Sequence, residues 1–416
     1  MLKPFSLSSA YCTGKAIVNI MHKNLTYSMS KNLFITLSIL FFCCFSLLAF
    51  RTFWTLSHTF TPDFSVYFQA AKNISTSLSV YTGPTRFTLF AYPLVSGVLF
   101  LPFIFLPYQT AQTTFLFLNF LALFGISFLS TKLLLKQHLV FFTGVIFSFA
   151  YLPFPTKFTL GMGQVNLIAC LLLLLSVYIY KQNLFKSTPY SHLLTGISFA
   201  VASMLKPILI FFLLFFLVQK QWRITLYVIS TFVVFFLFSL LIDHQALQDY
   251  MYYLFHVLPE VSKPVGKEIY YNQGLMSFVF REISNQQTRL AISYLGMLGL
   301  LFSGLFAIYN TKNILFQVSL LLTMIPLLDT LSWQHHFVFL IFPFLFAVTV
   351  CIKQKLWKWL GAIVAAYALV SWNFMHPELF TIFPKNLLLS NTFYGGLLLF
   401  LFFIFHQKSF QEHASH

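Results

Sequence analysis

The chain has 416 residues, of which 58% are hydrophobic and only 8% are charged, and its mean hydropathy is +0.81. A soluble domain needs roughly a quarter of its residues charged to keep its surface hydrated, so the composition excludes a soluble globular protein. The formal net charge of +16 comes from 25 lysines and arginines against 9 acidic residues. The basic residues stand in short clusters between apolar runs, which indicates membrane topology, and we expect no nucleic-acid partner.

Apolar runs of about 18 residues or more recur along the chain, and each is long enough to cross a bilayer as a helix. The sequence therefore predicts an all-α fold, a polytopic membrane bundle of about 12 transmembrane helices. We expect one transmembrane domain over 32–406, between cytoplasmic tails at 1–31 and 407–416. The first run ends at Arg51 without a small-residue cleavage site, so we expect a retained helix, and Met29 offers a second start.

The expected crossings follow from placing the basic clusters on the cytoplasmic side. The charges require one crossing within 88–131, so the proline-rich piece 88–107 is expected to be re-entrant or to lie on the surface. Lys206-Pro207 interrupts the apolar run between Lys186 and Lys220, which predicts two short crossings that meet at the outer face. The other predicted spans are 33–50, 137–153, 163–180, 224–242, 290–309, 313–330, 336–352, 357–373 and 388–405.

This topology predicts that the polar residues left over from the spans gather at the outer face of the membrane. Outer-face loops are expected at 51–87, 153–164 and 243–289. The polar residues that these loops and the outer span ends carry are Asp63, Gln164, Lys206, Asn272, Arg281, Asp329, His335 and His336.

Asp63 is the first acidic residue of the chain, and it begins a predicted amphipathic helix that continues to Tyr81. Thr61 can cap this helix and Pro62 suits its first position. Apolar residues follow at intervals of three and four, which is typical of a helix that lies in the membrane interface. A carboxylate in the first turn is stabilised as the anion and could act as a base, although an ordinary capping acid has the same local sequence.

Lys206 precedes a proline in an apolar run, so its ammonium group must reach the interface, pair with an acid or bind an anion. His335 and His336 are adjacent, and neighbours on a helix point about 100° apart, so they do not form a chelating pair. We therefore expect no metal site here, and contact with phosphate or hydroxyl groups is the stronger interpretation. Asp329 is a partner for a nearby base or a site residue.

The remaining polar motifs and the cysteines suggest no cofactor. Gln164 and Asn166 place two amides at the start of a span, where they either bind sugar hydroxyls or hold helices together. The five cysteines form no metal-binding or disulfide pattern. The sequence contains no phosphate-binding loop of the Walker type, no dinucleotide-binding glycine motif and no zinc-protease motif, so ATP, nicotinamide and zinc chemistry are not expected.

Taken in order along the chain, these motifs resemble glycosyltransferase family 87. This family comprises the polyprenol-phosphate-mannose-dependent α-(1→2)-mannosyltransferases of the C-type membrane glycosyltransferase fold. Two motifs depart from the family pattern: Tyr-Pro-Pro reads Tyr92-Pro93-Leu94, and Asn-Gln-Ser reads Asn272-Gln273-Gly274. The segments that carry the resemblance are Asp63-Phe-Ser-Val-Tyr67, Tyr92-Pro93, Gly163-Gln164-Val-Asn166, Lys206-Pro207, Asn272-Gln273-Gly274 with Arg281, and Ser332-Trp333-Gln334-His335-His336.

The resemblance implies transfer of a hexose, mannose in the family, from a polyprenyl-phosphate-linked donor to a glycolipid or glycan acceptor. It implies a multi-pass plasma (inner) membrane protein whose active site faces the extracytoplasmic side, with membrane lipids as further partners and no cofactor. Asp63 would be the catalytic base of an inverting displacement, since no second carboxylate is evident for a covalent intermediate. The implied substrate-binding residues are Lys206, Arg281, His335, His336, Gln164, Asn166, Asn272, Gln273, Tyr67 and Trp333.

Two other functions fit the same composition. A secondary transporter or lipid-linked glycan flippase would also be a polar-lined membrane bundle, but the chain lacks a convincing internal repeat. A polysaccharide ligase or polymerase would use an undecaprenyl-diphosphate-linked chain as its donor, and it would share the geometry of the preferred enzyme.

Overall fold

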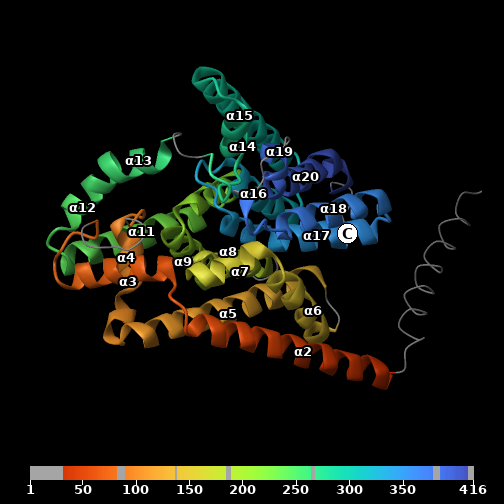
Figure 1. Cartoon of the computed structure of the whole chain (residues 1–416), viewed down its shortest axis with the longest axis horizontal. Coiled ribbons are helices and arrows are strands. Elements are labelled where there is room, and N and C mark those ends of the chain that lie inside the picture. Colours follow the sequence, from red (N-terminus) through yellow and green to blue (C-terminus); the bar gives the residue numbers. More distant parts are fainter. Residues whose placement is uncertain are drawn as a thin grey trace, which may run out of the picture. The chain divides into compact units, whose positions relative to one another are not determined.

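A computed structural model of the chain describes residues 31–81, 90–135, 138–183, 189–263, 268–377 and 385–410 (Figure 1). These residues form helices joined by short turns, and they contain one isolated β-bridge but no strand. The chain divides into two compact units, Met1–Thr52 and Phe53–His416. Helix α2 (Lys31–Ser57) supplies the described residues of the first unit and enters the second.

Four helical segments are long and apolar enough to cross a membrane. A fifth crossing is possible if the bent pair α6 (Leu139–Tyr151) and α7 (Phe154–Met162) forms one span, and eight shorter apolar helices accompany them. The protein is therefore an all-helical, multi-pass membrane protein, while the count of about twelve crossings remains a prediction. The four long segments are α5 (Tyr108–Leu134), α11 (Trp222–Ile242), α15 (Gln286–Tyr309), and the 3-10 helix η4 (Gln334–Leu340) with α17 (Ile341–Lys353).

The chain breaks at Lys206, as predicted. Helix α9 (Pro189–Leu205) ends one residue earlier, and the 3-10 helix η2 (Pro207–Phe212) begins one residue later and leads into α10 (Leu213–Val218). Proline forces the preceding residue out of the helical region, and Lys206 is accordingly extended, with φ −138° and ψ 94°. The segment 88–107 also avoids a full span, since its described part holds α4 (Leu94–Val98) and the 3-10 turn η1 (Leu101–Phe105).

Two segments expected as outer-face loops contain helices, and their position at the outer face remains a prediction. The expected outer loop at 153–164 contains helix α7, because Pro153 ends α6 and Pro155 then suits the first turn of a new helix, bent by 76° from the old one. The expected loop at 243–289 is largely helical. Its elements are α12 (Ala246–Tyr252), the π-helical turn η3 (Tyr253–Val257), α13 (Leu258–Ser262) and α14 (Leu275–Glu282).

The amphipathic helix after the first span is present as α3 (Pro62–Ser75), but it is shorter than predicted. It ends where Ser77 adopts a left-handed conformation with φ 52°, so the periodic residues beyond it, up to Tyr81, are not helical. Its apolar face is buried against α4 and η1. Among the charged residues of α3, Asp63 lies in its first turn and Lys72 in its last, which complements the helix dipole.

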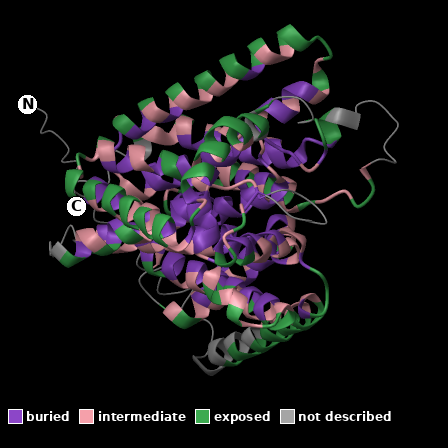
Figure 2. Cartoon of the chain, turned by 90° about the vertical axis from the view of Figure 1, so that its left-hand side faces the viewer, coloured by how far each residue is buried: buried purple, intermediate pink, exposed green. Residues whose placement is uncertain are grey.

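Helix α8 (Asn166–Asn183) lies at the centre of the second unit, between α5 and α9. Helix α9 packs in turn against α11, and α18 (Trp357–Ser371) packs against α20 (Asn391–His406). Figure 2 shows buried residues gathered in the interior of this bundle. The ends of α3, α7, α9 and α16 (Ile314–Leu328), together with η4, bring the candidate polar residues together.

Candidate functional site

Asp63 is held at the start of α3 by contacts that do not involve its own side chain. Thr61 precedes the helix in an extended conformation, and its side chain makes no capping hydrogen bond. Its backbone N–H donates instead to Gln112 Oε1 of α5 (3.3 Å), and Gln112 Nε2 donates to the carbonyl of Thr59 (2.7 Å). These bonds fix the entry to α3, while the Asp63 carboxylate accepts a hydrogen bond from Gln164 Nε2.

Gly163 makes the approach of Gln164 to Asp63 possible. It ends α7 in the left-handed region, with φ +69°, which glycine adopts without steric cost. A β-carbon at this position would lie 2.9 Å from Phe64 Cβ and 3.0 Å from Thr61 Cβ. The turn between α7 and α8 therefore contacts the first turn of α3 directly, and Gln164 spans the two helices.

The tyrosines Tyr67 and Tyr92 continue the polar contacts from Gln164. Tyr67 is one turn after Asp63 on α3, and its hydroxyl donates to Gln164 Oε1 (2.8 Å). The Tyr92 hydroxyl lies 3.4 Å from that of Tyr67 and 3.4 Å from Lys206 Nζ. Tyr92 therefore joins the part of the site on α3 to the part beside the α9 break.

Lys206 projects from that break onto a histidine and an acid. Its Nζ lies 2.7 Å from His336 Nε2, and both residues are buried. A lysine ammonium group only donates, so His336 Nε2 accepts and Nδ1 carries the ring proton. Nδ1 lies 3.1 Å from Asp329 Oδ2, a close electrostatic contact in which the N–H is not aligned for a hydrogen bond. The lysine cation is thus placed beside a neutral imidazole backed by an acid.

These contacts form one polar network, buried or partly buried throughout, from the first turn of α3 to the end of α16. It contains two acids, one lysine, one histidine and three neutral side chains that connect them. Sequence positions as far apart as 63 and 336 meet in it. We refer to it below as the polar network, and its members are Asp63, Gln164, Tyr67, Tyr92, Lys206, His336 and Asp329.

Burial dominates the protonation of Asp63. It raises the pKa of the carboxyl from 3.8 to about 6, and the hydrogen bond from Gln164 and the charge of Lys206 oppose the rise. A carboxyl with this pKa is mostly ionised at neutral pH and accepts a proton more readily than an ordinary aspartate. That property matches a general base that works near neutral pH.

The two adjacent histidines face different surroundings. His336 belongs to the polar network, whereas the His335 ring stacks almost parallel to Trp333 (6.3 Å, 6°) and packs against Phe158. The backbone carbonyl of His335 accepts hydrogen bonds from Asn166 Nδ2 (3.0 Å) and Thr159 Oγ1 (3.3 Å). The two rings still touch each other edge to face, with their centroids 4.7 Å apart, so they have different partners but lie side by side.

The motif at 272–274 is joined to the Trp333 segment through the backbone. Asn272 and Trp333 form an isolated antiparallel bridge, in which Gln273 N donates to Ser332 O (2.7 Å). The Gln273 amide also donates to the carbonyls of Tyr270 (2.5 Å) and Leu389 (2.7 Å). These bonds hold the chain on which His335 and His336 stand.

Arg281 of α14 supports the same bridge. Its guanidinium group donates to the carbonyl of Asn272 (2.7 Å) and to Ser390 Oγ (2.9 Å). A β-carbon at Gly274 would lie 2.6 Å from the carbonyl oxygen of Asp329, so this close approach of the two chain segments requires glycine. We call Asn272, Gln273, Arg281 and Trp333 the bridge region. Because Gln273 and Arg281 both donate to backbone carbonyls, this region is built around the main chain.

The family of the protein follows from its sequence as a whole. The chain matches the family described as Glycosyltransferase family 87 over residues 90–325, which is more than half of its length. It belongs to that family. Membership makes the protein a membrane glycosyltransferase, which uses a sugar donor and an acceptor. No curated protein and no solved structure matched the chain.

The family 87 match does not cover the whole polar network. It includes Tyr92, Gln164 and Lys206, but Asp63 precedes it and Asp329 and His336 follow it. Asp329 was expected as a partner for a nearby base or as a site residue, and it lies beside His336. Tyr92 was not among the residues expected at the site. Its place in the Tyr92-Pro93 motif was the available signal, but sequence alone does not indicate that its hydroxyl bridges Tyr67 and Lys206.

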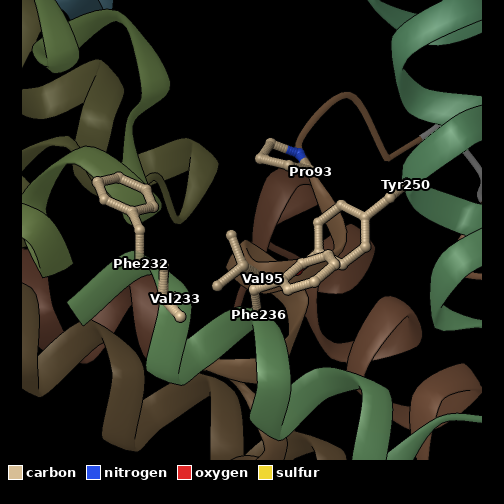
Figure 3. Close-up of a pocket in the computed structure, with 6 residues that line it drawn as sticks. All are labelled: Pro93, Val95, Phe232, Val233, Phe236 and Tyr250. Atoms are coloured by element: carbon tan, nitrogen blue, oxygen red, sulfur yellow. The ribbon is translucent and has the colours of Figure 1, made fainter. Parts of the chain in front are cut away.

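This family 87 protein also has an open apolar pocket beside the network (Figure 3). Its volume is about 330 Å³, and it lies between the start of α4, helix α11 and helix α12. Tyr92, a network residue, immediately precedes one of its lining residues. The lining residues are Pro93, Val95, Phe232, Val233, Phe236 and Tyr250. Within the described residues, no three His, Cys, Asp or Glu side chains gather to hold a metal ion.

Proposed function

We propose that this protein transfers a hexose, most simply mannose, from a polyprenyl-phosphate donor to an acceptor hydroxyl at the extracytoplasmic face of the plasma membrane. The observation that carries the proposal is the polar network, which connects a base of raised pKa, Asp63, to a buried cation, Lys206. Glycosyl transfer needs both groups, one to accept the proton of the acceptor and one to stabilise the departing phosphate.

In this mechanism Asp63 removes the proton from the acceptor hydroxyl as its oxygen attacks the anomeric carbon. The new C–O bond forms while the bond between the anomeric carbon and the phosphate oxygen breaks, and the phosphate leaves with the electron pair. Gln164 binds Asp63 Oδ2, so we assign Oδ1 to the acceptor hydroxyl. The charge of Lys206 stabilises the phosphate, and His336 keeps its Nζ in place.

A single displacement with inversion fits the roles of the two acids. Asp63 is the acid at the base position, whereas Asp329 faces His336 and accepts a hydrogen bond from the backbone N–H of Leu331 (3.1 Å). A retaining reaction would need a second carboxylate about 5 Å from the first to form a covalent intermediate. The engagement of Asp329 with His336 therefore supports inversion.

The apolar pocket supports a lipid-linked donor. Pro93 lines the pocket and Tyr92 touches Lys206, so one step along the chain separates an apolar surface from the cation. A polyprenyl phosphate has the same arrangement, with a hydrocarbon chain attached directly to an anion. Burial of isoprenoid carbons contributes roughly 25 cal/mol for each Å² of apolar surface, so even a short stretch of chain would add to donor affinity.

Reconstituted protein in liposomes tests the proposal. Supplied with radiolabelled polyprenyl-phosphate mannose and a glycolipid fraction, wild type should transfer label, and Asp63→Asn should lose activity by a factor of about 10²–10⁴, the usual value of a general base. Glu260→Gln, an exposed acid paired with Lys263, is the matched control and should keep wild-type activity. Near-normal transfer by Asp63→Asn would remove Asp63 from the base role.

The same liposomes separate the competing functions. Movement of labelled glycolipid across the bilayer without glycosyl transfer would support a flippase or transporter. Transfer from a polyprenyl-diphosphate-linked glycan, but not from the monophosphate sugar, would support a ligase or polymerase. For sidedness, a cysteine in place of Ile208, next to the α9 break, should react with an impermeant reagent added from the extracytoplasmic side. Labelling only from the cytoplasmic side would contradict the proposed orientation.

A further inference from the structure

Asp249 is a buried acid on α12 that the proposed reaction does not use. Its Oδ1 accepts a hydrogen bond from Ser79 Oγ (2.5 Å), and its Oδ2 accepts one from the backbone N–H of Val80 (2.8 Å). The donors belong to the chain that follows α3, about 170 positions earlier. The carboxylate therefore ties α12 to residues 79–80.

The position of Asp249 in the first turn of α12 suggests a second, simpler role. An acid there complements the helix dipole whatever else it contacts. A carboxylate can interact with the helix dipole while it is exposed to water. The side chain of Asp249 is buried instead, and burial raises its pKa. A buried carboxylate is costly unless donors satisfy it, and these donors come from the chain beyond α3. The contact with residues 79–80 is thus a specific one.

Residues 79–80 lead directly to the polar network through Tyr81. The Tyr81 hydroxyl donates to the backbone carbonyl of Tyr92 (2.8 Å), and its ring packs against Phe90 and Tyr252. Tyr92 in turn lies 3.4 Å from Lys206 Nζ. A continuous series of bonds therefore runs from Asp249 through residues 79–81 to the backbone of Tyr92.

The same residues adjoin two walls of the apolar pocket. Tyr250, the neighbour of Asp249, lines the pocket from α12, and Pro93, the neighbour of Tyr92, lines it from the start of α4 (Figure 3). The bonds from Asp249 to residues 79–81 and on to Tyr92 thus link these two walls through the chain beyond α3. They also fix where Tyr92 stands relative to Lys206.

We propose that Asp249 is a positioning residue that couples occupancy of the apolar pocket by the prenyl chain of the donor to the placement of Tyr92 and Lys206. The inference rests on the proposed lipid-linked donor. Enzymes use binding energy from remote parts of a substrate to organise the reacting centre, so a long prenyl chain should raise the rate of transfer as well as affinity. Through its bonds to residues 79–80, Asp249 links binding of the prenyl chain in the pocket to the position of Tyr92 in the polar network.

The experiment compares donors with a long and a short prenyl chain, of about ten and two isoprene units, in the reconstituted enzyme. Wild type should use the long donor better, by kcat/KM. Asp249→Ala should lower kcat/KM for the long donor by about tenfold or more and for the short donor by less than about threefold, so the advantage of the long chain shrinks. Asp249→Asn, which can still accept from Val80 N–H, should restore part of the advantage.

Tyr81→Phe is the second variant, because it removes the bond to the Tyr92 carbonyl and keeps the ring. It should show the same selective loss for the long donor, and the double variant Asp249→Ala/Tyr81→Phe should lose no more than the worse single variant. Glu260→Gln should leave both donors unaffected. If Asp249→Ala fails to fold, Tyr81→Phe and Ser79→Ala carry the test.

An equal loss for both donors, or additive losses in the double variant, would overturn the coupling role and leave Asp249 as a structural residue. Failure of the proposed function looks different, because wild type itself would then transfer mannose from neither donor. In that case the coupling inference falls together with the function on which it rests.

Discussion

The polar network and the bridge region both contain residues that the sequence singled out as candidates for the site, yet they are built differently. In the network, polar side chains bind one another: Asp63 accepts a hydrogen bond from Gln164, and Lys206 contacts His336. In the bridge region, Gln273 and Arg281 donate hydrogen bonds to backbone carbonyls, and Arg281 also donates to Ser390. Motif residues near a site can therefore act in the reaction or hold the chain that does, and only the partners of each side chain separate the two.

Among variants of the polar network, a substitution of Lys206 should reduce the rate of transfer most after Asp63→Asn. Lys206→Met keeps an unbranched side chain but removes the charge that should stabilise the leaving phosphate, so we expect kcat to fall by about 10²–10³. Lys206→Arg should recover part of the loss, since it keeps the charge with a different shape. Steady-state transfer from polyprenyl-phosphate mannose measures both variants. A fall of less than about fivefold in Lys206→Met would exclude Lys206 from stabilising the phosphate.

The pH dependence of the reaction should report the carboxyl of Asp63. Because burial raises its pKa to about 6, kcat/KM should be constant above that pH and fall about tenfold for each unit below it. A profile of kcat/KM between pH 4.5 and 8 in liposomes measures this limb. The residual activity of Asp63→Asn should lack the limb, and a wild-type profile that is flat through pH 6 would contradict the assignment.

Asp63→Asn should also change the stability of the protein, by less than it changes the rate and in the opposite sense: the less active variant should be the more stable one. The pKa of Asp63 is higher in the folded protein, about 6, than its ordinary 3.8, so the protonated form favours folding and the charge disfavours it. This stabilising contribution is complete below pH 3.8 and is lost as the pH rises through 6. At pH 8 we therefore expect Asp63→Asn to be more stable than wild type, by about 1–3 kcal/mol.

Unfolding at pH 4 and pH 8 measures that difference. The gain in the free energy of unfolding should be largest at pH 8 and small at pH 4, while Glu260→Gln should show no gain at either pH. A variant that is less stable than wild type at pH 8 would mean that Asp63 is held in place for structure and is not a strained functional group.

Local sequence rules predicted the parts of the fold that depend on neighbouring residues. Pro207 fixes an extended Lys206 and so the break in α9, and Thr61-Pro62 fixes the start of α3. They gave no prediction for α7, because a proline that ends one helix also suits the start of the next, and sequence does not say which effect prevails. The membrane character followed from composition alone, since lipid-facing surface needs no charge.

The contacts within the site were beyond such rules. Asp63 meets Gln164 across 101 positions, and the approach depends on Gly163, whose missing β-carbon lets two helices touch. The pairing of Asn272 with Trp333 depends on a single isolated bridge between two distant segments. Asp249 was not identified at all, because its partners at 79–80 carry no motif.

The most direct test measures activity per folded molecule for one variant from each region. Asp63→Asn should remain folded and be nearly inactive. Gln273→Ala, which loses bonds to Tyr270 and Leu389, should be destabilised by about 2–4 kcal/mol, yet its folded fraction should transfer mannose within about fivefold of wild type. The reverse result, a stable and inactive Gln273→Ala beside an active Asp63→Asn, would contradict the account and move the reaction to the bridge region.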